Sequence, residues 1–249
     1  MSGLITYKLG LPVSDPINDS ELLEKMSNLI FANNDVRPTW KGPGYGTTDV
    51  EEFKAKVNWA NQHWALYYGF IKNDERENNL ILDLGCGSGF CTTNLSYLYP
   101  NASIRGYDID KGVIDFAKTV NPCSNVEYTA EDITDSILPT GVDTIFLVEI
   151  LEHIKHHKHF DFLDKCLASL KDDTSRIYLT TPNEQTYFEG DRGHIGILTT
   201  TLFTLFKERY QNNIVSVDFY DNTKLIDNEV EDYISKTPKS HYRVILKKN

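Results

Sequence analysis

The sequence predicts an α/β fold in which helices cover both faces of a seven-stranded, mostly parallel sheet. The first observation is that short apolar strands alternate with helical segments after the polar run at 72–79, a pattern typical of parallel sheets. The second is that no long helical segment separates the last two strands, so we expect a final antiparallel hairpin around an acidic insertion at 221–239. The expected strands are Leu80–Leu84, Ser103–Asp108, Val126–Thr129, Val142–Val148, Arg176–Thr180, Ile214–Phe219 and Tyr242–Lys247.

The region before the sheet is expected to form an N-terminal helical cap or lid at 1–75, followed by the sheet domain at 76–249. Apolar residues recur at helical spacing on both sides of a loop rich in Gly and Pro at 37–46. Aromatic side chains at helical spacing usually pack against a core. We expect most of them to hold the cap in place, and Tyr45 and His63 to line a substrate pocket.

Composition bounds the compartment and the partners. The chain has 249 residues, enough for one α/β domain with an appended segment, and a formal net charge of -11. Lysines and arginines are spread singly, so no broad basic surface is expected and duplex nucleic acid is disfavoured as a substrate. Neither a signal peptide nor a membrane span is expected. The cysteines lack CxxC spacing, which favours free thiols in a reducing cytoplasm; they are Cys86, Cys91, Cys123 and Cys166.

The strongest chemical signal is a glycine loop that follows the first strand. Gly85, Gly87 and Gly89 alternate there, and glycines allow a tight turn and a close approach of the backbone to a ligand. No Walker-type Gly-Lys-Ser/Thr ending is present, so a loop that cradles a nucleoside triphosphate is disfavoured. Asp108 ends the second strand about twenty residues later, where a carboxylate accepts hydrogen bonds from ribose hydroxyls. Loop and acid together predict an adenosyl ligand.

The segment from Leu80 to Asp110, together with 130–133 and 142–153, resembles the class I, Rossmann-like S-adenosylmethionine-dependent methyltransferases. The resemblance covers roughly 79–202, and the combination of motifs is far more specific than a glycine loop alone. It implies a Rossmann-like sheet, S-adenosylmethionine (SAM) as the cofactor and S-adenosylhomocysteine (SAH) as the product.

The resemblance also implies roles for individual cofactor residues. Asp108 corresponds to the acid that holds the ribose, and Asp132 to the acid that usually meets the adenine amine. Ile109 and Ile133 are the expected apolar walls around the base. Capping of helices by these acids is the alternative role. The complete set of expected cofactor residues is Asp83, Gly85, Cys86, Gly87, Asp108, Ile109, Asp132, Ile133 and Glu149.

The segment 148–154 resembles the E-x-L-E-H segment of many small-molecule and sugar O-methyltransferases, which places Glu149, Glu152 and His153 near the reactive sulfonium. Methyl transfer is an in-line displacement, so the protein mainly aligns the two reactants. A hydroxyl acceptor must also lose a proton. His153 is the first candidate for the general base, with Glu152 beside it, because an imidazole titrates near neutral pH. A capping or packing role for the Glu-His pair is the alternative.

A polar loop after the fifth strand carries two more candidates. His194 is the second candidate base, and Arg192 is suited to hold an acidic group of the substrate. A loop that merely faces water is the alternative. The histidines within 156–159 are expected to form the solvated first turn of a helix at 155–170 rather than a metal site.

We therefore expect SAM-dependent O-methylation of a small hydroxylated metabolite or sugar, for example a glycan precursor. Oxygen is preferred because an amine acceptor needs less help from a base. One alternative is a metal-dependent 2′-O-methyltransferase of RNA terminal riboses, a class that combines an E-x-x-E-H segment with a distant histidine; the acidic net charge disfavours it. A NAD-linked oxidoreductase is disfavoured because Phe90 stands where GxGxxG has its third glycine. The non-catalytic alternative is an adenosyl-ligand sensor.

Overall fold

The computed structural model describes residues 76–120, 123–182, 196, 198, 200–220, 234–235 and 241–249. The cap expected at 1–75, with Tyr45 and His63, lies outside these residues, and so do Arg192 and His194. The predictions made for them therefore stay predictions.

Strands and helices alternate as the apolar pattern predicts, and the bounds of the seven expected strands agree with the structure to within two residues. In chain order, the elements are β1 (Leu80–Leu84), α4 (Phe90–Leu98), β2 (Ser103–Asp108), α5 (Lys111–Val120), β3 (Val126–Ala130), β4 (Thr144–Val148), η3 (Leu151–His153), η4 (His156–Lys158), α6 (His159–Ser169), β5 (Arg176–Pro182), α7 (Thr200–Arg209), β6 (Ile214–Tyr220), β7 (Ile234–Ser235) and β8 (His241–Lys247).

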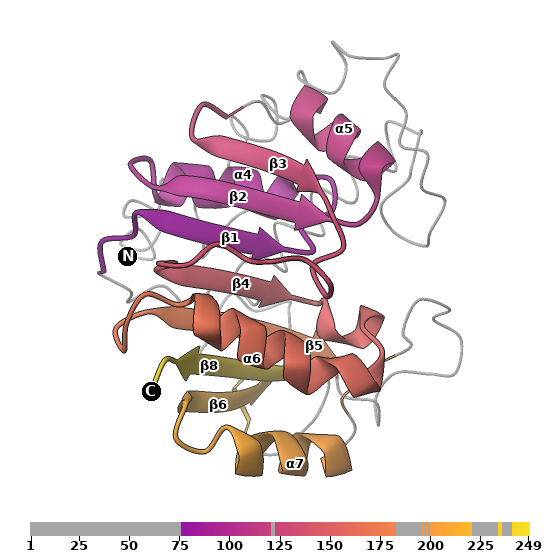
Figure 1. Cartoon of the computed structure of the whole chain (residues 1–249), viewed down its shortest axis with the longest axis vertical. Helices are drawn as coiled ribbons and strands as arrows, with labels where there is room; N and C mark the ends of the chain where they lie inside the picture. Colours follow the sequence, from indigo (N-terminus) through magenta and orange to yellow (C-terminus); the bar gives the residue numbers. More distant parts are fainter. Residues whose placement is uncertain are drawn as a thin grey trace. The chain divides into compact units, whose positions relative to one another are not determined.

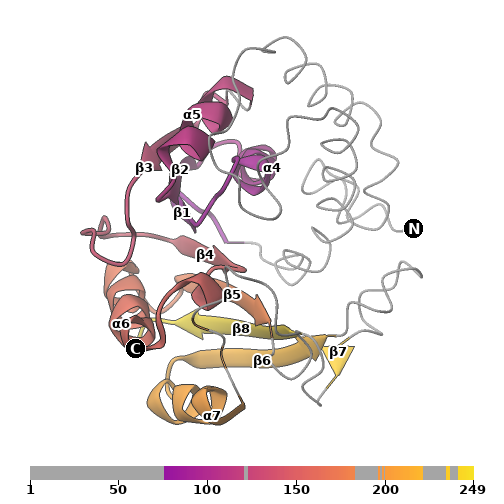
Figure 2. The same cartoon turned by 90° about the vertical axis from the view of Figure 1, so that its right-hand side faces the viewer.

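The sheet is mixed, with the strand order β3-β2-β1-β4-β5-β8-β6-β7 (Figure 1). β2 pairs with β3, and β4 pairs with β1 and β5, all in parallel. β8 runs antiparallel between β5 and β6, which confirms the antiparallel finish. An additional eighth strand, β7, lies inside the acidic insertion and pairs with the end of β6 (Figure 2). It was not predicted because two residues are too few to show an alternating pattern.

The chain divides into two compact units, and each is described in turn. Among the described residues, the first unit contains α4, β2, α5 and β3. Its core includes Ile114 and Ala117 of α5, which pack with Tyr128 of β3 and with Cys86. α5 begins where it does because the carboxylate of Asp110 accepts the first free N–H groups of the helix.

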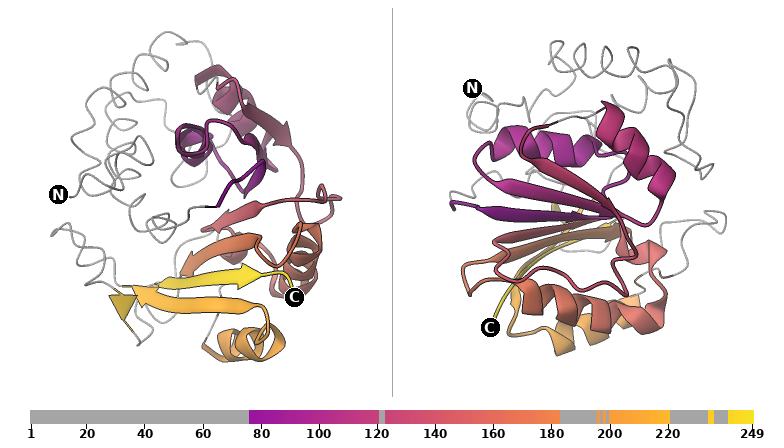
Figure 3. Two further views of the ribbon diagram at one scale, coloured as in Figure 1. Left: turned by 90° about the vertical axis from the view of Figure 1, so that its left-hand side faces the viewer. Right: turned by 45° about the horizontal axis from the view of Figure 1, so that its top comes forward.

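The second unit contains β1 and the elements from β4 onward. β4 is buried along four of its five residues, because both faces of a central parallel strand are covered. α6 and α7 lie next to each other (Figure 3), and the hydroxyl of Tyr210 after α7 donates to Asp164 of α6 at 2.8 Å. α7 packs on β8 where the ring of Phe203 stacks on Tyr242, with centroids 4.0 Å apart.

The expected start of the helix at 155–170 is wrong. A separate turn, η4, precedes it, and α6 begins at His159, which is 3% exposed rather than solvated. Its Nε2 lies 2.9 Å from the carbonyl oxygen of Leu151 and 2.8 Å from that of Ile154. Two acceptors at one ring nitrogen require that this nitrogen carries the proton and donates to both. The buried imidazole is therefore satisfied by carbonyl groups of η3 and of the residue that follows it.

The structure also bears on the expected thiols and on the expected absence of a membrane span. None of the four cysteines forms a disulfide in the structure, as expected. None of the helices that the structure describes is long and apolar enough to cross a membrane.

Candidate functional site

In the first unit, backbone hydrogen bonds shape the glycine loop. The N–H of Cys86 donates to Tyr107 O at 2.9 Å, and the N–H of Gly89 donates to Cys86 O at 3.0 Å, which closes a tight turn ahead of α4. Gly87 and Gly89 have φ angles of 53° and 76°, a left-handed conformation that disfavours any other residue. The side chain of Cys86 packs against Ile114 in the core. We therefore expect Cys86 to meet a cofactor through its backbone.

Asp108 joins this loop to the end of β2. Its Oδ2 accepts the N–H of Gly87 at 3.0 Å, and its Oδ1 accepts the N–H of Asp110 at 3.0 Å. A carboxylate oxygen can accept more than one hydrogen bond, so a ligand donor can share it. The next side chain, Ile109, is apolar yet 70% exposed. The corner thus offers acceptors beside an uncovered apolar side chain, which fits a ribose and one face of an adenine.

Tyr128 of β3 supports the loop and was not predicted as a site residue. Its hydroxyl donates to the carbonyl oxygen of Gly89 at 3.1 Å. A Cβ at Gly89 would collide with the same hydroxyl, and a Cβ at Gly106 would lie 2.9 Å from Cδ1 of the ring. The sequence signal is indirect: a tyrosine at an inward-facing strand position usually directs its hydroxyl to a partner.

In the second unit, β1 ends with Asp83 and Leu84, and Gly85 follows it. Asp83 is 2% exposed, so little of its side chain is open to a ligand. Its role at a cofactor stays a prediction. Gly85 has a φ of 82°, and a Cβ there would lie 2.5 Å from Cδ1 of Ile150. Ile150 directly follows Glu149 in the segment after β4. Only glycine at position 85 leaves room for this segment to lie so close to the end of β1.

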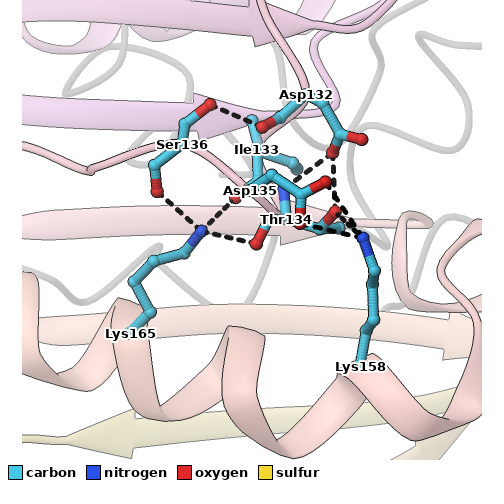
Figure 4. A network of polar contacts seen from close by, with 7 residues as sticks. All are labelled: Asp132, Ile133, Thr134, Asp135, Ser136, Lys158 and Lys165. Atoms are coloured by element: carbon cyan, nitrogen blue, oxygen red, sulfur yellow. Dashed lines mark hydrogen bonds and ion pairs between the residues drawn. The ribbon is translucent and has the colours of Figure 1, made fainter.

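The turn after β3 holds Asp132 in a fixed conformation (Figure 4). Its Oδ1 accepts hydrogen bonds from the N–H (2.9 Å) and the hydroxyl (2.7 Å) of Thr134. Burial opposes ionisation, but these bonds and the charges of Lys158 and Lys165 outweigh it, so the pKa of Asp132 lies below its usual value. Among the described residues only Oδ1 is bonded, which leaves Oδ2 for a ligand donor such as an adenine amine. Ile133 is buried.

Glu149 follows β4 in a strained conformation with a φ of 52°. Its N–H donates to Thr180 O at 3.0 Å, and its Oε2 lies 3.1 Å from Nε2 of the fully buried His241. Within the described residues, Oε1 of Glu149 is buried without a hydrogen-bond partner. Strain and an unsatisfied buried acceptor are both typical of functional sites. Sequence reasoning missed His241, which is found only from the register of β8 against β5.

Glu152 and His153 both lie in η3 but differ in their surroundings. Glu152 is 1% exposed, its Oε2 accepts the hydroxyl of Thr181 at 3.0 Å, and its carbonyl oxygen accepts the N–H of Gly196 at 2.9 Å. His153 is exposed. The buried glutamate is therefore suited to fix the turn, and the exposed imidazole is suited to meet a substrate.

The two glutamates reach opposite faces of the sheet. His241 pairs with Pro182 in the β5–β8 register, and Pro182 is the neighbour of Thr181. Since successive strand residues point to opposite faces, Thr181 and His241 lie on different faces. Glu152 contacts the first and Glu149 the second. In the part of the chain that the structure describes, no three His, Cys, Asp or Glu side chains gather as a metal site.

These strand ends carry left-handed glycines and fixed carboxylates, the features of a Rossmann-like domain that binds an adenosyl ligand. Residues 81–173 match the family described as "Methyltransferase domain". With the sheet topology, this match makes residues 81–173 similar to a methyltransferase domain of Rossmann-like fold.

Curated relatives include both O- and N-methyltransferases. A malonyl-[acyl-carrier protein] O-methyltransferase from Bacillus anthracis is 34% identical over 91 residues, which cover 32% of this chain and 34% of that protein. A mitochondrial ubiquinone biosynthesis O-methyltransferase from Schizosaccharomyces pombe is 32% identical over 106 residues, covering 41% and 37%. A (S)-coclaurine N-methyltransferase from Thalictrum flavum is 31% identical over 86 residues, covering 33% and 24%. The chain thus spans about a third of the length of the first two relatives.

Solved structures share the fold. A SAM-dependent methyltransferase from Archaeoglobus fulgidus aligns with a TM-score of 0.57 at 18% identity, covering 80% of this chain and 97% of that one. The DhpI–SAH complex aligns with a TM-score of 0.56 at 16% identity, covering 92% and 97%. The Rossmann-like fold expected from the sequence is confirmed.

Proposed function

We propose that this chain transfers a methyl group from SAM to an oxygen atom of a small hydroxylated metabolite or sugar, such as a glycan precursor, and releases SAH. The observation that carries the proposal is the carboxylate of Asp108, fixed between the N–H groups of Gly87 and Asp110 at the end of β2. A carboxylate at this position suits a ribose diol. The family match at 81–173 favours methyl transfer over other uses of an adenosyl site.

The described residues fit the cofactor, which supplies an electrophilic methyl group on a sulfonium. Asp108 would hold the ribose hydroxyls, and Oδ2 of Asp132 would accept a hydrogen bond from the adenine amine. Ile109 would cover one face of the base, because its side chain is both apolar and exposed. The remaining residues that we assign to the cofactor are Asp83, Gly85, Cys86, Gly87, Ile133 and Glu149.

On the acceptor side, we assign proton removal to His153. Its ring is exposed at the end of η3, so an acceptor hydroxyl can reach it. Glu152 is buried against Thr181 and fixes the turn that carries His153. His194 is the second candidate base; in support of it, Gly196, two residues later in the sequence, bonds to the carbonyl oxygen of Glu152.

The substrate assignments rest on the same chemistry. Oxygen is preferred to nitrogen because a hydroxyl needs a base and the proposed site includes two histidines. Two of the relatives named above are O-methyltransferases and one is an N-methyltransferase. Tyr45, His63 and Arg192 are proposed to bind the acceptor. Four cysteines that form no disulfide favour a reducing compartment, and we place the protein in the cytoplasm.

The test is incorporation of labelled methyl groups. The purified chain is incubated with methyl-labelled SAM and with separate metabolite, glycan-precursor, protein and RNA fractions of the source cell. Label should enter the metabolite or glycan-precursor fraction, and the chemical shift of the methyl carbon should show that it is attached to oxygen. Label confined to RNA, with a requirement for manganese, would replace this acceptor by a terminal ribose. No label in any fraction would overturn the function.

A further inference from the structure

Two lysines, Lys158 at the N-cap of α6 and Lys165 within α6, reach the turn that follows β3 (Figure 4). Lys165 donates from Nζ to three backbone carbonyl oxygens, those of Ile133, Thr134 (3.0 Å) and Ser136 (2.8 Å). An ammonium group has three protons and no acceptor, so these carbonyls use its full donor capacity. The turn would otherwise direct three carbonyl dipoles at one point without a donor, which is costly in a partly buried place.

Lys158 holds the same turn from its other end. Its Nζ lies 3.0 Å from Oγ1 of Thr134 and 2.9 Å from Oδ1 of Asp135. The same Thr134 hydroxyl donates to Oδ1 of Asp132. A continuous chain of contacts therefore runs from α6 through the turn to the carboxylate of Asp132, and it occupies one of that carboxylate's two oxygens.

The electrostatics of the turn agree with this arrangement. Burial lowers the pKa of Lys165, because removing the ammonium group from water disfavours its charged form. The carboxylates of Asp135 and Asp132 act in the opposite direction and favour the charged lysine. The same two lysines help to lower the pKa of Asp132, which keeps its free oxygen ionised as an acceptor.

We propose that Lys165 is a positioning residue for the adenine subsite: by binding the carbonyls of the 133–136 turn, it holds the carboxylate of Asp132 where Oδ2 accepts the adenine amine. The inference rests on the proposed use of SAM, and it adds a residue outside the glycine loop and the strand ends. Lys158 has the same role with fewer contacts. Both lysines determine selectivity for adenine over bases that lack the amine.

The test compares two ligands by isothermal titration calorimetry. SAH carries the adenine amine, and S-inosylhomocysteine carries a carbonyl oxygen in its place. The wild-type chain should bind SAH at least about tenfold more tightly than the inosine analogue, since a hydrogen bond to a carboxylate is replaced by repulsion. Lys165→Met should weaken SAH binding about tenfold, leave the analogue nearly unchanged, and so remove most of the discrimination.

Two variants keep the test independent of folding. Lys158→Met removes only the contacts to Thr134 and Asp135, and should show the same loss of discrimination at about a third of its size. Lys118→Met, at an exposed lysine of α5, should leave both affinities unchanged. Thermal unfolding of each variant shows whether the protein that was titrated is folded; if Lys165→Met does not fold, Lys158→Met decides the question.

The outcomes separate the proposed function from the proposed role of Lys165. If the wild-type chain does not bind SAH, the proposed function fails. If it binds SAH and the lysine variants keep the wild-type discrimination, the positioning role of Lys165 is wrong while the function stands. Equal weakening of both ligands would also contradict the proposal, because it would show a general structural role rather than placement of Asp132.

Discussion

The corner formed by Gly87 and Asp108 and the segment from Glu149 to His153 contribute differently to the proposed reaction, and they are built differently. In the corner, the backbone N–H of Gly87 donates directly to the carboxylate of Asp108. In the segment, side chains find distant partners: Glu149 contacts His241, 92 residues away, and Glu152 contacts Thr181, 29 residues away. The corner depends on backbone geometry, and the segment depends on packing between strands.

This difference explains how one kind of cofactor corner can be combined with different acceptor segments in different proteins. A corner made of glycine backbone and one carboxylate has little freedom to change, because the φ of 53° at Gly87 disfavours any residue that has a Cβ. A segment whose side chains are held by β5 and β8 changes whenever those strands change. The cofactor is therefore common to a class of proteins and the acceptor is specific to each. The following predictions test each side of this contrast.

The largest effect is expected at the acceptor segment. His153→Ala should lower the rate of methyl incorporation by about 10²- to 10⁴-fold, the range for loss of a general base, while the affinity for SAH changes less than about twofold. His157→Ala is the matched control, since His157 is also exposed in a neighbouring short turn. An unchanged rate for His153→Ala would move the base to another group, with His194 as the next candidate.

The next effect concerns the backbone of the glycine loop and is read as stability. Gly85→Ala should lower the free energy of unfolding by about 3 kcal/mol, from a left-handed φ plus a clash with Ile150. Gly141 also has a φ of 76°, but a Cβ added there would meet no atom within 4 Å, so Gly141→Ala should cost only about 1 to 2 kcal/mol. Urea unfolding measures both. Equal losses would mean that the contact with Ile150 does not constrain position 85.

Removing the carboxylate of Asp108 should change the free energy of SAH binding by an amount comparable to the stability loss expected for Gly85→Ala. Asp108→Ala deletes the acceptor of Gly87 and Asp110 and the proposed partner of the ribose, and should weaken SAH binding about a hundredfold, or ~2.7 kcal/mol. Asp115→Ala, which removes an exposed acid of α5, should bind SAH as the wild type does. Calorimetry separates the two. Similar affinities for both variants would remove Asp108 from the cofactor site.

The smallest effect is a pH dependence at the turn that carries the acceptor segment. Burial lowers the pKa of His159 below 6.5, and the nearby His156 lowers it further. The unfolded chain therefore takes up a proton near pH 6.5 while the folded chain does not, so this contribution to stability is complete above pH 6.5 and is lost as pH falls below it.

The corresponding measurement is urea unfolding at pH 7.5 and pH 5.5. Between these values the wild type should lose about 1 kcal/mol more stability than His159→Gln, whose amide donates to the same carbonyls without titrating. The exposed His157→Gln should keep the wild-type dependence. If His159→Gln and the wild type lose the same amount, the buried imidazole is not the source of the dependence.

The contrast between corner and segment also accounts for what the sequence could predict. The glycine loop and Asp108 lie about twenty residues apart, and glycine spacing directly reports backbone shape, so this part of the site was predictable. His241 was missed because its meeting with Glu149 depends on the β5–β8 register, which no local pattern encodes. His159 was expected in solvent because the carbonyls that bury it belong to a turn that periodicity does not show.

Lys158, at the N-cap of α6, and Lys165, within α6, show the same limit. Each reads in the sequence as an ordinary solvated charge, and their meaning comes from a turn more than twenty residues earlier in the chain. Fold class, strand positions and cofactor chemistry follow from short-range patterns. Contacts between side chains of separate elements follow only from the assembled sheet and its helices.

The central claim is that the corner at Asp108 binds an adenosyl-sulfonium cofactor, and calorimetric titration of the purified chain with SAH and with NAD tests it most directly. The account predicts one-to-one binding of SAH that the Asp108→Ala change weakens about a hundredfold, and no measurable binding of NAD. Tight binding of NAD without binding of SAH would contradict it.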